Sequence, residues 1–161
     1  MNHHKRRLPA GRAGFFLIEV IVASSIMAVV LILLIGSIQD TVEVSRRALE
    51  RTQASYLLEE GAEATKTIRD ASWSGIASLT PGIPYYLSFN GTVWSFTATP
   101  NTIGQFTRTV GISPVYRDAN DDIAASGTLD SGTILVNTTV SWEASSGTQT
   151  KSLDFYIANI R

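Results

Sequence analysis

The feature that most constrains this chain is an apolar run without any charged residue, which begins at Val20 and ends at Gln39. A helix of this length would be about 30 Å long, which matches the hydrocarbon core of a bilayer. A secretory signal peptide has a shorter apolar core of about 7–15 residues, followed by a cleavage site of the A-x-A type. The far end of this run instead reads Gly36-Ser37-Ile38-Gln39. We therefore predict a membrane-spanning helix rather than a signal peptide or a helix of a soluble core.

The residues that flank the run predict its orientation in the membrane. The basic residues Lys5, Arg6, Arg7 and Arg12 precede it. Because lysine and arginine favour the cytoplasmic side, the amino terminus is expected inside and everything after the run outside. Glu19 stands at the start of the run, and a carboxylate at mid-bilayer costs about 2.5–3.5 kcal/mol, less near the interface. An ordinary signal anchor offers no reason for such a residue, so Glu19 is a functional hypothesis that needs a partner.

The stretch Gly14-Phe15-Phe16-Leu17-Ile18-Glu19 resembles the class III signal of type IV pilins and type II secretion pseudopilins. In that family a short basic leader ends in glycine, and an apolar helix follows that starts with phenylalanine and has glutamate as its fifth residue. The resemblance is strong from Gly14 to about Ile38 and weaker beyond. It implies a pilin-like α+β fold, with one long amino-terminal helix packed on a mostly antiparallel sheet of four or five strands.

The resemblance also implies roles for single residues. A prepilin peptidase would cut between Gly14 and Phe15 and methylate the new amino terminus at Phe15. Glu19 would then form an assembly ion pair with the amino group of Phe15, on a neighbouring subunit or its own. Many major pilins have a proline in the second half of the apolar helix, where this chain has Gly36-Ser37. Any softening of the helix at that point would rest on the permissive backbone of glycine.

The composition argues against an enzyme and predicts no cofactor. The chain has no cysteine, and its two histidines are His3 and His4, in the leader. A processed chain would therefore lack the residues of a Ser-His-Asp or Cys-His mechanism, and a metal site would need more ligands than this pair. Residues 15–161 contain 9 basic and 14 acidic residues, a net charge of −5. No basic patch indicates a nucleic-acid partner.

The residues from Asp40 to Ala71 include no proline and favour a helix that continues the apolar one. Apolar or small residues recur every three or four positions, which predicts one buried face. They are Ala54, Leu57, Leu58, Gly61, Ala62, Thr65 and Ile68. Gly61 costs about 1 kcal/mol relative to alanine inside a helix, so it predicts a close approach of another element.

Beyond a connecting loop predicted at Ser72–Pro84, the sequence pattern changes to the alternation of β-strands. Asn90-Gly91 predicts a tight hairpin turn, because both residues tolerate a positive φ. The predicted strands are Tyr85–Phe89, Val93–Thr97, Gln105–Ile112, Thr133–Glu143 and Thr150–Ile160. Their order in the sheet does not follow from the sequence. One apolar face of the sheet is expected to cover the helical stripe that runs from Ala54 to Ile68.

Two polar motifs remain. Asp118, Asn120 and Asp122 alternate as calcium ligands do, within an acidic stretch predicted to interrupt the strands. The EF-hand pattern, however, requires glycine and glutamate where this chain has Ile123 and Leu129, so a solvated acidic turn is the preferred interpretation, although major pseudopilins do bind calcium in a loop. Two N-x-T triplets stand at Asn90 and Asn137, and such triplets also arise by chance.

We therefore expect a leader (1–14), a transmembrane and polymerisation helix (15–39), its amphipathic continuation (40–71) and a carboxy-terminal β-region (72–161) that forms one globular domain with the continuation. The first functional hypothesis is a structural, minor subunit of a pilus or secretion pseudopilus. Its expected partners are other pilin subunits, the prepilin peptidase and the membrane. The end of the chain resembles V-type minor pilins and I-type pseudopilins. The alternative is an uncleaved, membrane-anchored binding or adhesion domain outside the cell.

Overall fold

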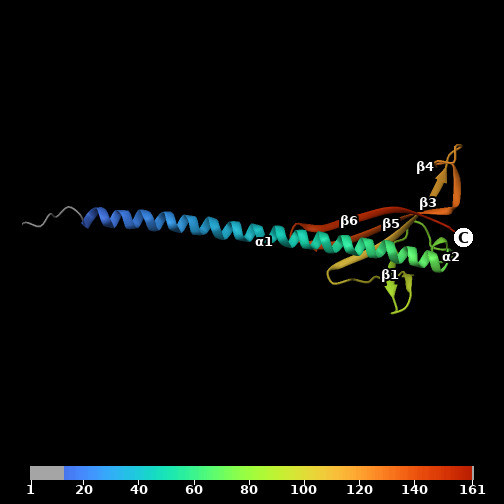
Figure 1. Cartoon of the computed structure of the whole chain (residues 1–161), viewed down its shortest axis with the longest axis horizontal. Helices are drawn as coiled ribbons and strands as arrows, with labels where there is room; N and C mark the ends of the chain where they lie inside the picture. Colours follow the sequence, from blue (N-terminus) through green and yellow to red (C-terminus); the bar gives the residue numbers. More distant parts are fainter. Residues whose placement is uncertain (1–12, 161) are drawn as a thin grey trace, which may run out of the picture. The chain divides into compact units, whose positions relative to one another are not determined.

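A computed structural model describes residues 13–160, and their side chains from residue 16 onward. The predicted leader, with His3 and His4, thus lies outside the described residues apart from its last two positions. The chain divides after Arg46 into two compact units. The helix α1 (Ala13–Ala71) begins in the first unit and ends in the second, and no break interrupts its 59 residues (Figure 1). The continuous helix expected from the sequence is therefore confirmed.

The second unit is an antiparallel β-structure that covers the last part of α1. Strands β1 (Tyr86–Phe89) and β2 (Trp94–Thr97) form a hairpin, as the Asn90-Gly91 signal predicted. Gly91 has a φ of 94°, which a residue with a side chain rarely adopts. An isolated bridge between Tyr85 and Val110 connects this hairpin to the larger sheet.

The larger sheet has four strands in the order β4-β3-β5-β6. They are β3 (Phe106–Arg117), β4 (Ile123–Ala124), β5 (Thr128–Ala144) and β6 (Gly147–Ala158). All of the pairings are antiparallel, and β5 lies in the centre between β3 and β6. The α+β fold with a helix on a mostly antiparallel sheet is therefore confirmed, with the strands divided between a sheet of four and a hairpin.

Several predicted boundaries were wrong, and one of them is the start of β6, which lies at Gly147 rather than at Thr150. Strand β3 continues past Ile112 to Arg117, and β5 begins at Thr128 rather than at Thr133. The pairing of β3 with β5 shifts between Pro114 and Val115, and this irregularity lets the ladder continue beyond a residue that lacks a backbone N–H. The predicted loop at Ser72–Pro84 contains a short helix, α2 (Ser74–Ala77). Backbone pairing supports these extensions where side-chain alternation is weak.

The core of the second unit lies between the sheet and the predicted helical stripe. Two clusters of buried side chains form it. One contains Ala54, Leu58, Phe106, Val140 and Trp142, and the other contains Ala64, Ile68, Ile76, Leu87, Val110, Ile112, Val136 and Ile157. The small residues on the helix let the backbone of α1 approach the sheet closely. This packing fixes one face of the helix and leaves the other available.

Gly61 marks a close approach of the helix to the sheet, as its position in the sequence predicted. A Cβ atom built there would lie 2.8 Å from Cγ2 of Thr138 and 3.1 Å from Cδ of Arg108. Real Cβ atoms essentially never come within 3.0 Å of another heavy atom, so only glycine fits here without a shift of the neighbouring side chains. Gly36, in the first unit, has no atom within 4 Å of the same built position.

Candidate functional site

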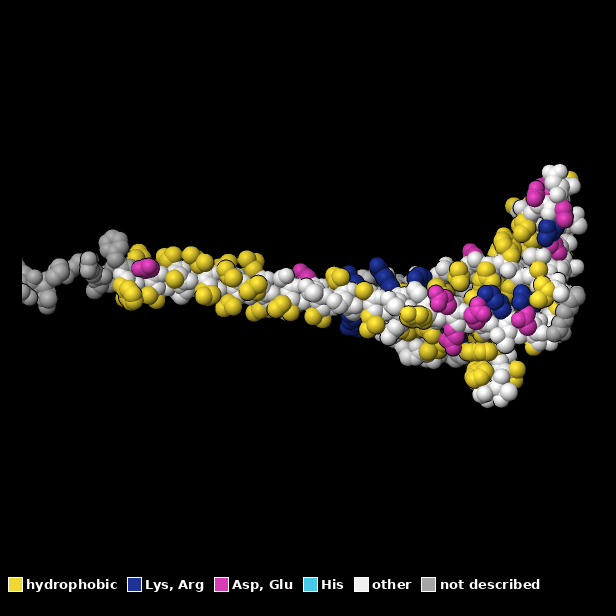
Figure 2. Space-filling view, in the orientation of Figure 1, with side chains coloured by type: hydrophobic (Ala, Val, Ile, Leu, Met, Phe, Trp, Pro, Cys, Tyr) yellow, Lys and Arg dark blue, Asp and Glu magenta, His cyan; other side chains and the backbone are white. Residues whose placement is uncertain are grey.

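Between Phe16 and Gln39, the helix of the first unit presents a largely apolar surface. Every described side chain from Phe16 to Asp40 is exposed, and Figure 2 shows the hydrophobic side chains covering this part of the helix. The large ones include Leu17, Ile32 and Leu33, which are 65–69% exposed. One helix in the described residues, this one, is long and apolar enough to cross a membrane. An apolar surface of this extent needs lipid or other protein around it, because water is a poor solvent for it.

Three hydroxyl groups of this helix form hydrogen bonds with its own backbone. The hydroxyls of Ser24 and Ser25 both donate to the backbone oxygen of Ile21, at 2.9 and 2.7 Å. Thr41 donates in the same way to the backbone oxygen of Ser37, at 2.8 Å. Such bonds to the preceding turn let serine and threonine lie in an apolar environment. The helix thus stays continuous through Gly36 and Ser37, and whether this pair softens it remains a prediction.

Glu19 is the one carboxylate on this surface between Phe16 and Gln39. It is exposed, and no described side chain forms a hydrogen bond or an ion pair with it. Gly14 and Phe15 belong to the first turns of α1, but their side chains are not among those described. The predicted cleavage site and the pairing of Glu19 with the amino group of Phe15 therefore remain predictions.

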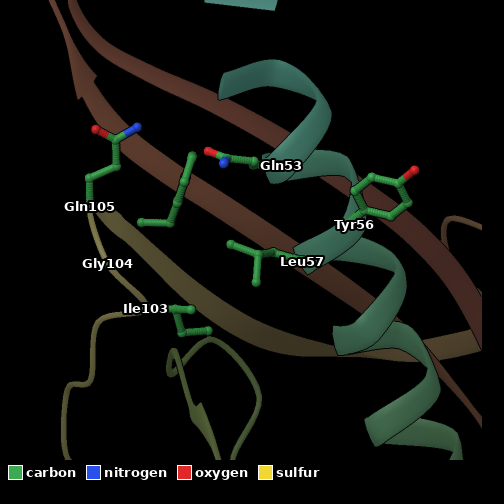
Figure 3. A pocket seen from close by; sticks show the side chains of 7 residues that line it. Gln53, Tyr56, Leu57, Ile103, Gly104 and Gln105 are labelled. Atoms are coloured by element: carbon green, nitrogen blue, oxygen red, sulfur yellow. The ribbon is translucent and has the colours of Figure 1, made fainter. Parts of the chain in front are cut away.

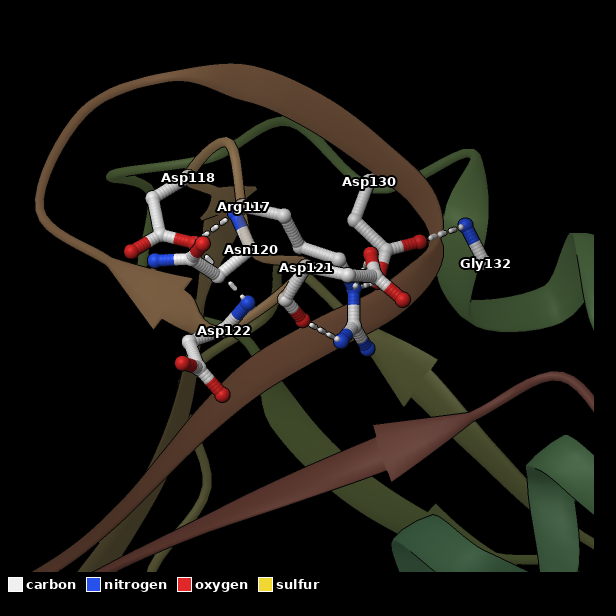
Figure 4. A network of polar contacts seen from close by, with 7 residues as sticks. All are labelled: Arg117, Asp118, Asn120, Asp121, Asp122, Asp130 and Gly132. Atoms are coloured by element: carbon white, nitrogen blue, oxygen red, sulfur yellow. Dashed lines mark hydrogen bonds and ion pairs between the residues drawn. The ribbon is translucent and has the colours of Figure 1, made fainter.

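The acidic stretch forms a tight turn that its own side chains hold together (Figure 4). Oδ1 of Asp118 accepts the backbone N–H groups of Asn120 and Asp122, at 2.8 and 3.0 Å. Asp121 has a φ of 67°, a left-handed conformation that aspartate tolerates better than most residues. Among the described residues, no group of three or more His, Cys, Asp or Glu side chains is placed to hold a metal ion. The geometry gives Asp118 the role of a turn cap.

Arg117 connects this turn to β5. Its Nε donates to Oδ2 of Asp130 at 2.7 Å, and its Nη1 donates to the backbone oxygen of Asp121 at 2.7 Å. The hydrogen bond from Arg117 is the largest cause that lowers the pKa of the Asp130 carboxyl, and bonds from Thr133 and from the backbone of Gly132 add to it. The same bond raises the pKa of Arg117. This pair stabilises the turn electrostatically at neutral pH.

A buried arginine is the main feature that sequence reasoning missed. The side chain of Arg108, on β3, is only 2% exposed, yet it carries a charge. Its Nη1 donates to Oε2 of Glu60 at 2.7 Å and to the backbone oxygen of Leu57 at 3.2 Å, and its guanidinium lies 5.6 Å from the ring centroid of Trp94. Two signals in the sequence could have revealed it. Arg108 occupies an inward position in the alternation of β3, and Gly61 leaves room on the helix.

A buried carboxylate, Glu50, lies nearer the amino-terminal end of the unit. Glu50 is 5% exposed, and its Oε2 accepts the indole N–H of Trp142 at 3.3 Å. Glu50 and Glu60 are thus two acidic residues of α1 that bind polar groups of the sheet. Their partners Trp142 and Arg108 lie on adjacent strands. Both contacts orient the helix on the sheet, and neither creates an open catalytic cleft.

A shallow groove of about 540 Å³ opens between α1 and the loop that precedes β3 (Figure 3). Gln53, Tyr56 and Leu57 line its helical side, and Ile103 and Gln105 line the other. Tyr56 is 66% exposed. The lining carries no carboxylate, histidine or cysteine, and most of its surface is apolar.

Comparison with known proteins assigns no family. No family model, no curated protein and no solved structure matches the chain closely enough to establish a relationship.

Proposed function

We propose that this chain is a structural, minor subunit of a type IV pilus or of a type II secretion-like pseudopilus. The observation that carries the proposal is the apolar helix from Phe16 to Ile38, whose side chains are exposed all round and which includes a single carboxylate. Gly14 and Phe15 precede it in the order of a prepilin cleavage site. Such a helix suits two environments in turn, the bilayer and the interior of a helical filament.

The two environments treat Glu19 differently. In the membrane, its carboxylate can be protonated or can be hydrated at the interface. In a filament, neighbouring apolar helices close around it, and an unpaired buried charge is very costly. Cleavage after Gly14 would create a cation at the right depth, the amino group of Phe15. Cleavage and assembly are then coupled through one ion pair, and an uncut leader blocks assembly because it caps the amine.

The ion pair also sets the axial register of the subunits. Sliding one apolar helix past another costs little in van der Waals contacts, since similar side chains replace one another. Separating two opposite charges in a medium of low dielectric constant costs much more. The register with Glu19 next to an amino terminus is therefore favoured over all the others. The globular unit, on the outer side of the membrane, would cover the surface of the filament.

The groove between Tyr56 and Ile103 supports a second candidate, a membrane-anchored binding or adhesion domain that is never cleaved. An exposed apolar groove can hold a partner without any filament. The two candidates differ in the fate of Gly14, which is cut in the first and intact in the second. They also differ in what Glu19 does, because an anchor needs no carboxylate.

Incorporation into filaments tests the proposal. Tagged wild type, Glu19→Leu and Glu19→Gln are expressed in the native host, and the fraction of each in sheared filaments is compared with the fraction left in the membrane. Glu59→Gln is the matched control, since it removes an exposed carboxylate of the second unit. We expect normal membrane insertion and cleavage for all variants, and reduced incorporation for both Glu19 variants alone. Equal incorporation of Glu19→Leu and wild type would exclude the ion-pair mechanism.

A further inference from the structure

The two N-x-T triplets of this chain lie in opposite structural settings. Asn90 and Thr92 are exposed at the turn between β1 and β2, and Asn90 follows directly on the last residue of β1. Asn137 lies inside β5, the central strand, where it pairs with Gly111 on one side and with Asp154 on the other. The same sequence motif is thus exposed to solvent at Asn90 and part of a sheet at Asn137.

Hydrogen bonding separates the two asparagine side chains further. Nδ2 of Asn137 donates to the carboxylate of Asp154, and its Oδ1 accepts the hydroxyl of Thr139, the third residue of the same triplet. Both ends of that amide are occupied, and so is the threonine hydroxyl that the motif requires. Any enzyme that modifies Asn137 must first open the centre of the sheet, and such openings are rare.

In Asn90, only the oxygen of the side-chain amide forms hydrogen bonds with described residues. Its Oδ1 accepts the backbone N–H groups of Thr92 and Val93, at 3.0 and 2.9 Å, which closes an Asx turn within the triplet. Its Nδ2 forms no hydrogen bond with any described residue. Next to the turn, Phe89 pairs with Trp94, and their rings contact each other with centroids 5.0 Å apart and an angle of 37° between their planes. The carbonyl end is therefore fixed, and the nitrogen end is left available.

From this contrast we propose that Asn90 is an acceptor for N-linked sugar transfer in the folded chain, and that Asn137 is not. The co-substrate is an oligosaccharide linked to a polyprenyl diphosphate. Nδ2 of Asn90 forms a bond to the anomeric carbon, the bond from that carbon to the diphosphate oxygen breaks, and the lipid diphosphate leaves. Nδ2 gives one proton to a base of the transferase.

The Asx turn assists this step. Loss of a proton from Nδ2 places negative charge on Oδ1, and two N–H groups already point at that oxygen. Hydrogen bonds that are in place before the reaction stabilise developing charge without reorganisation. In a cell the reaction needs residues 40–161 outside the membrane, so it rests on the topology of the proposed function. The competence of the site does not depend on cleavage or assembly.

The test uses the full chain in detergent micelles, a purified oligosaccharyltransferase and a lipid-linked oligosaccharide. The enzyme is chosen because it modifies two free peptides, one that spans residues 85–97 and one that spans residues 132–144. Mass spectrometry after proteolysis then gives the occupancy of each asparagine in the folded chain. We expect occupancy of Asn90 to exceed that of Asn137 by more than about tenfold, since opening of a central strand is rare.

Two variants of Thr92 distinguish the triplet from unspecific labelling. Thr92→Ser keeps the hydroxyl and should keep Asn90 modified, whereas Thr92→Ala should abolish the modification. Both keep the backbone N–H that Asn90 accepts. An unmodified Asn90 in the full chain, or equal occupancy of Asn90 and Asn137, would overturn the proposal. A chain unmodified at Asn90 but cut after Gly14 would leave the proposed function intact.

Discussion

The two parts of helix α1 show how the same secondary structure can serve different partners. In the first unit, apolar side chains surround the helix and all those described up to Asp40 are exposed. In the second unit, the apolar side chains form a stripe, and Ala54, Leu58 and Ala62 are at most 6% exposed. A stripe is completed by one sheet of the same chain, whereas a fully apolar surface needs lipid or several other helices around it. The pattern around the helix, rather than its helicity, decides what it binds.

The largest difference between the two parts of the helix is expected from a pair of leucine truncations. Leu58 is 4% exposed in the core of the second unit, and Leu33 is 68% exposed in the first. Leu58→Ala should lower the free energy of unfolding of the second unit by about 2–5 kcal/mol, because it leaves a cavity. Leu33→Ala should change that free energy by less than about 0.5 kcal/mol.

Tryptophan fluorescence measures these changes selectively. All three tryptophans, Trp73, Trp94 and Trp142, lie in the second unit. Urea unfolding of the full chain in micelles, followed at the tryptophan emission, therefore reports on that unit alone. Similar losses for both leucine variants would show that the first unit contributes to the core of the second.

A pair of glycine substitutions should also affect the stability of the second unit differently, by a smaller amount. Alanine is a better helix former than glycine by about 1 kcal/mol at both positions. At Gly61 its Cβ would meet Thr138 at 2.8 Å, and overpacking of this kind costs about 1–3 kcal/mol. We expect Gly61→Ala to destabilise the second unit by roughly 1 kcal/mol net. Gly36→Ala should leave the urea midpoint of the second unit unchanged, and a gain in stability for Gly61→Ala would refute the close contact.

The smallest expected effect is a pH dependence that arises at the turn beside β5. The folded state lowers the pKa of Asp130, with the hydrogen bond from Arg117 as the main cause. A carboxyl whose pKa is lower when folded stabilises the protein above its unfolded pKa of about 3.9, and this contribution is lost as the pH falls through the folded value. Asp130→Asn should therefore be less stable than wild type near neutral pH.

The difference between Asp130→Asn and wild type should shrink as the pH falls. Urea midpoints measured between about pH 6 and pH 2 would show the two curves converging on the acidic side, where the wild-type carboxyl is protonated as well. The substitution Asp122→Asn serves as the control, because this exposed carboxyl belongs to the same turn and does not accept a bond from Arg117. Parallel curves for Asp130→Asn and wild type would exclude the predicted linkage.

Local patterns were enough to predict most of the fold. Asn90-Gly91 predicted the hairpin because the turn needs a positive φ, and Gly61 predicted the close contact with the sheet. The strand at Thr133–Glu143 was found from its alternation, but its extension back to Thr128 was not. That extension depends on backbone pairing with β3 after a register shift, which side-chain patterns do not encode.

The features of the candidate site also differ in whether the sequence predicts them. The long apolar helix could be predicted because it follows from hydropathy, whereas the role of Glu19 stays a prediction. The inward position of Arg108 in β3 hinted at its burial, but its partners did not follow from the sequence, because Glu60 and Leu57 are distant along the chain and meet Arg108 only when the helix packs on the sheet. The groove beside Tyr56 is likewise formed by two distant segments. Contacts between segments that are distant along the chain do not follow from the patterns of a single sequence.

The amino terminus of the protein isolated from its native host distinguishes a cleaved pilin subunit from an uncleaved membrane anchor. Intact mass and terminal sequencing determine it in one preparation, with Gly14→Leu as a variant that a peptidase requiring a small residue should leave uncut. We expect the wild-type chain to begin at Phe15 and to carry one methyl group on its amine. A chain that begins at Met1, or one that begins near Ser37 after cleavage as a signal peptide, would contradict this expectation.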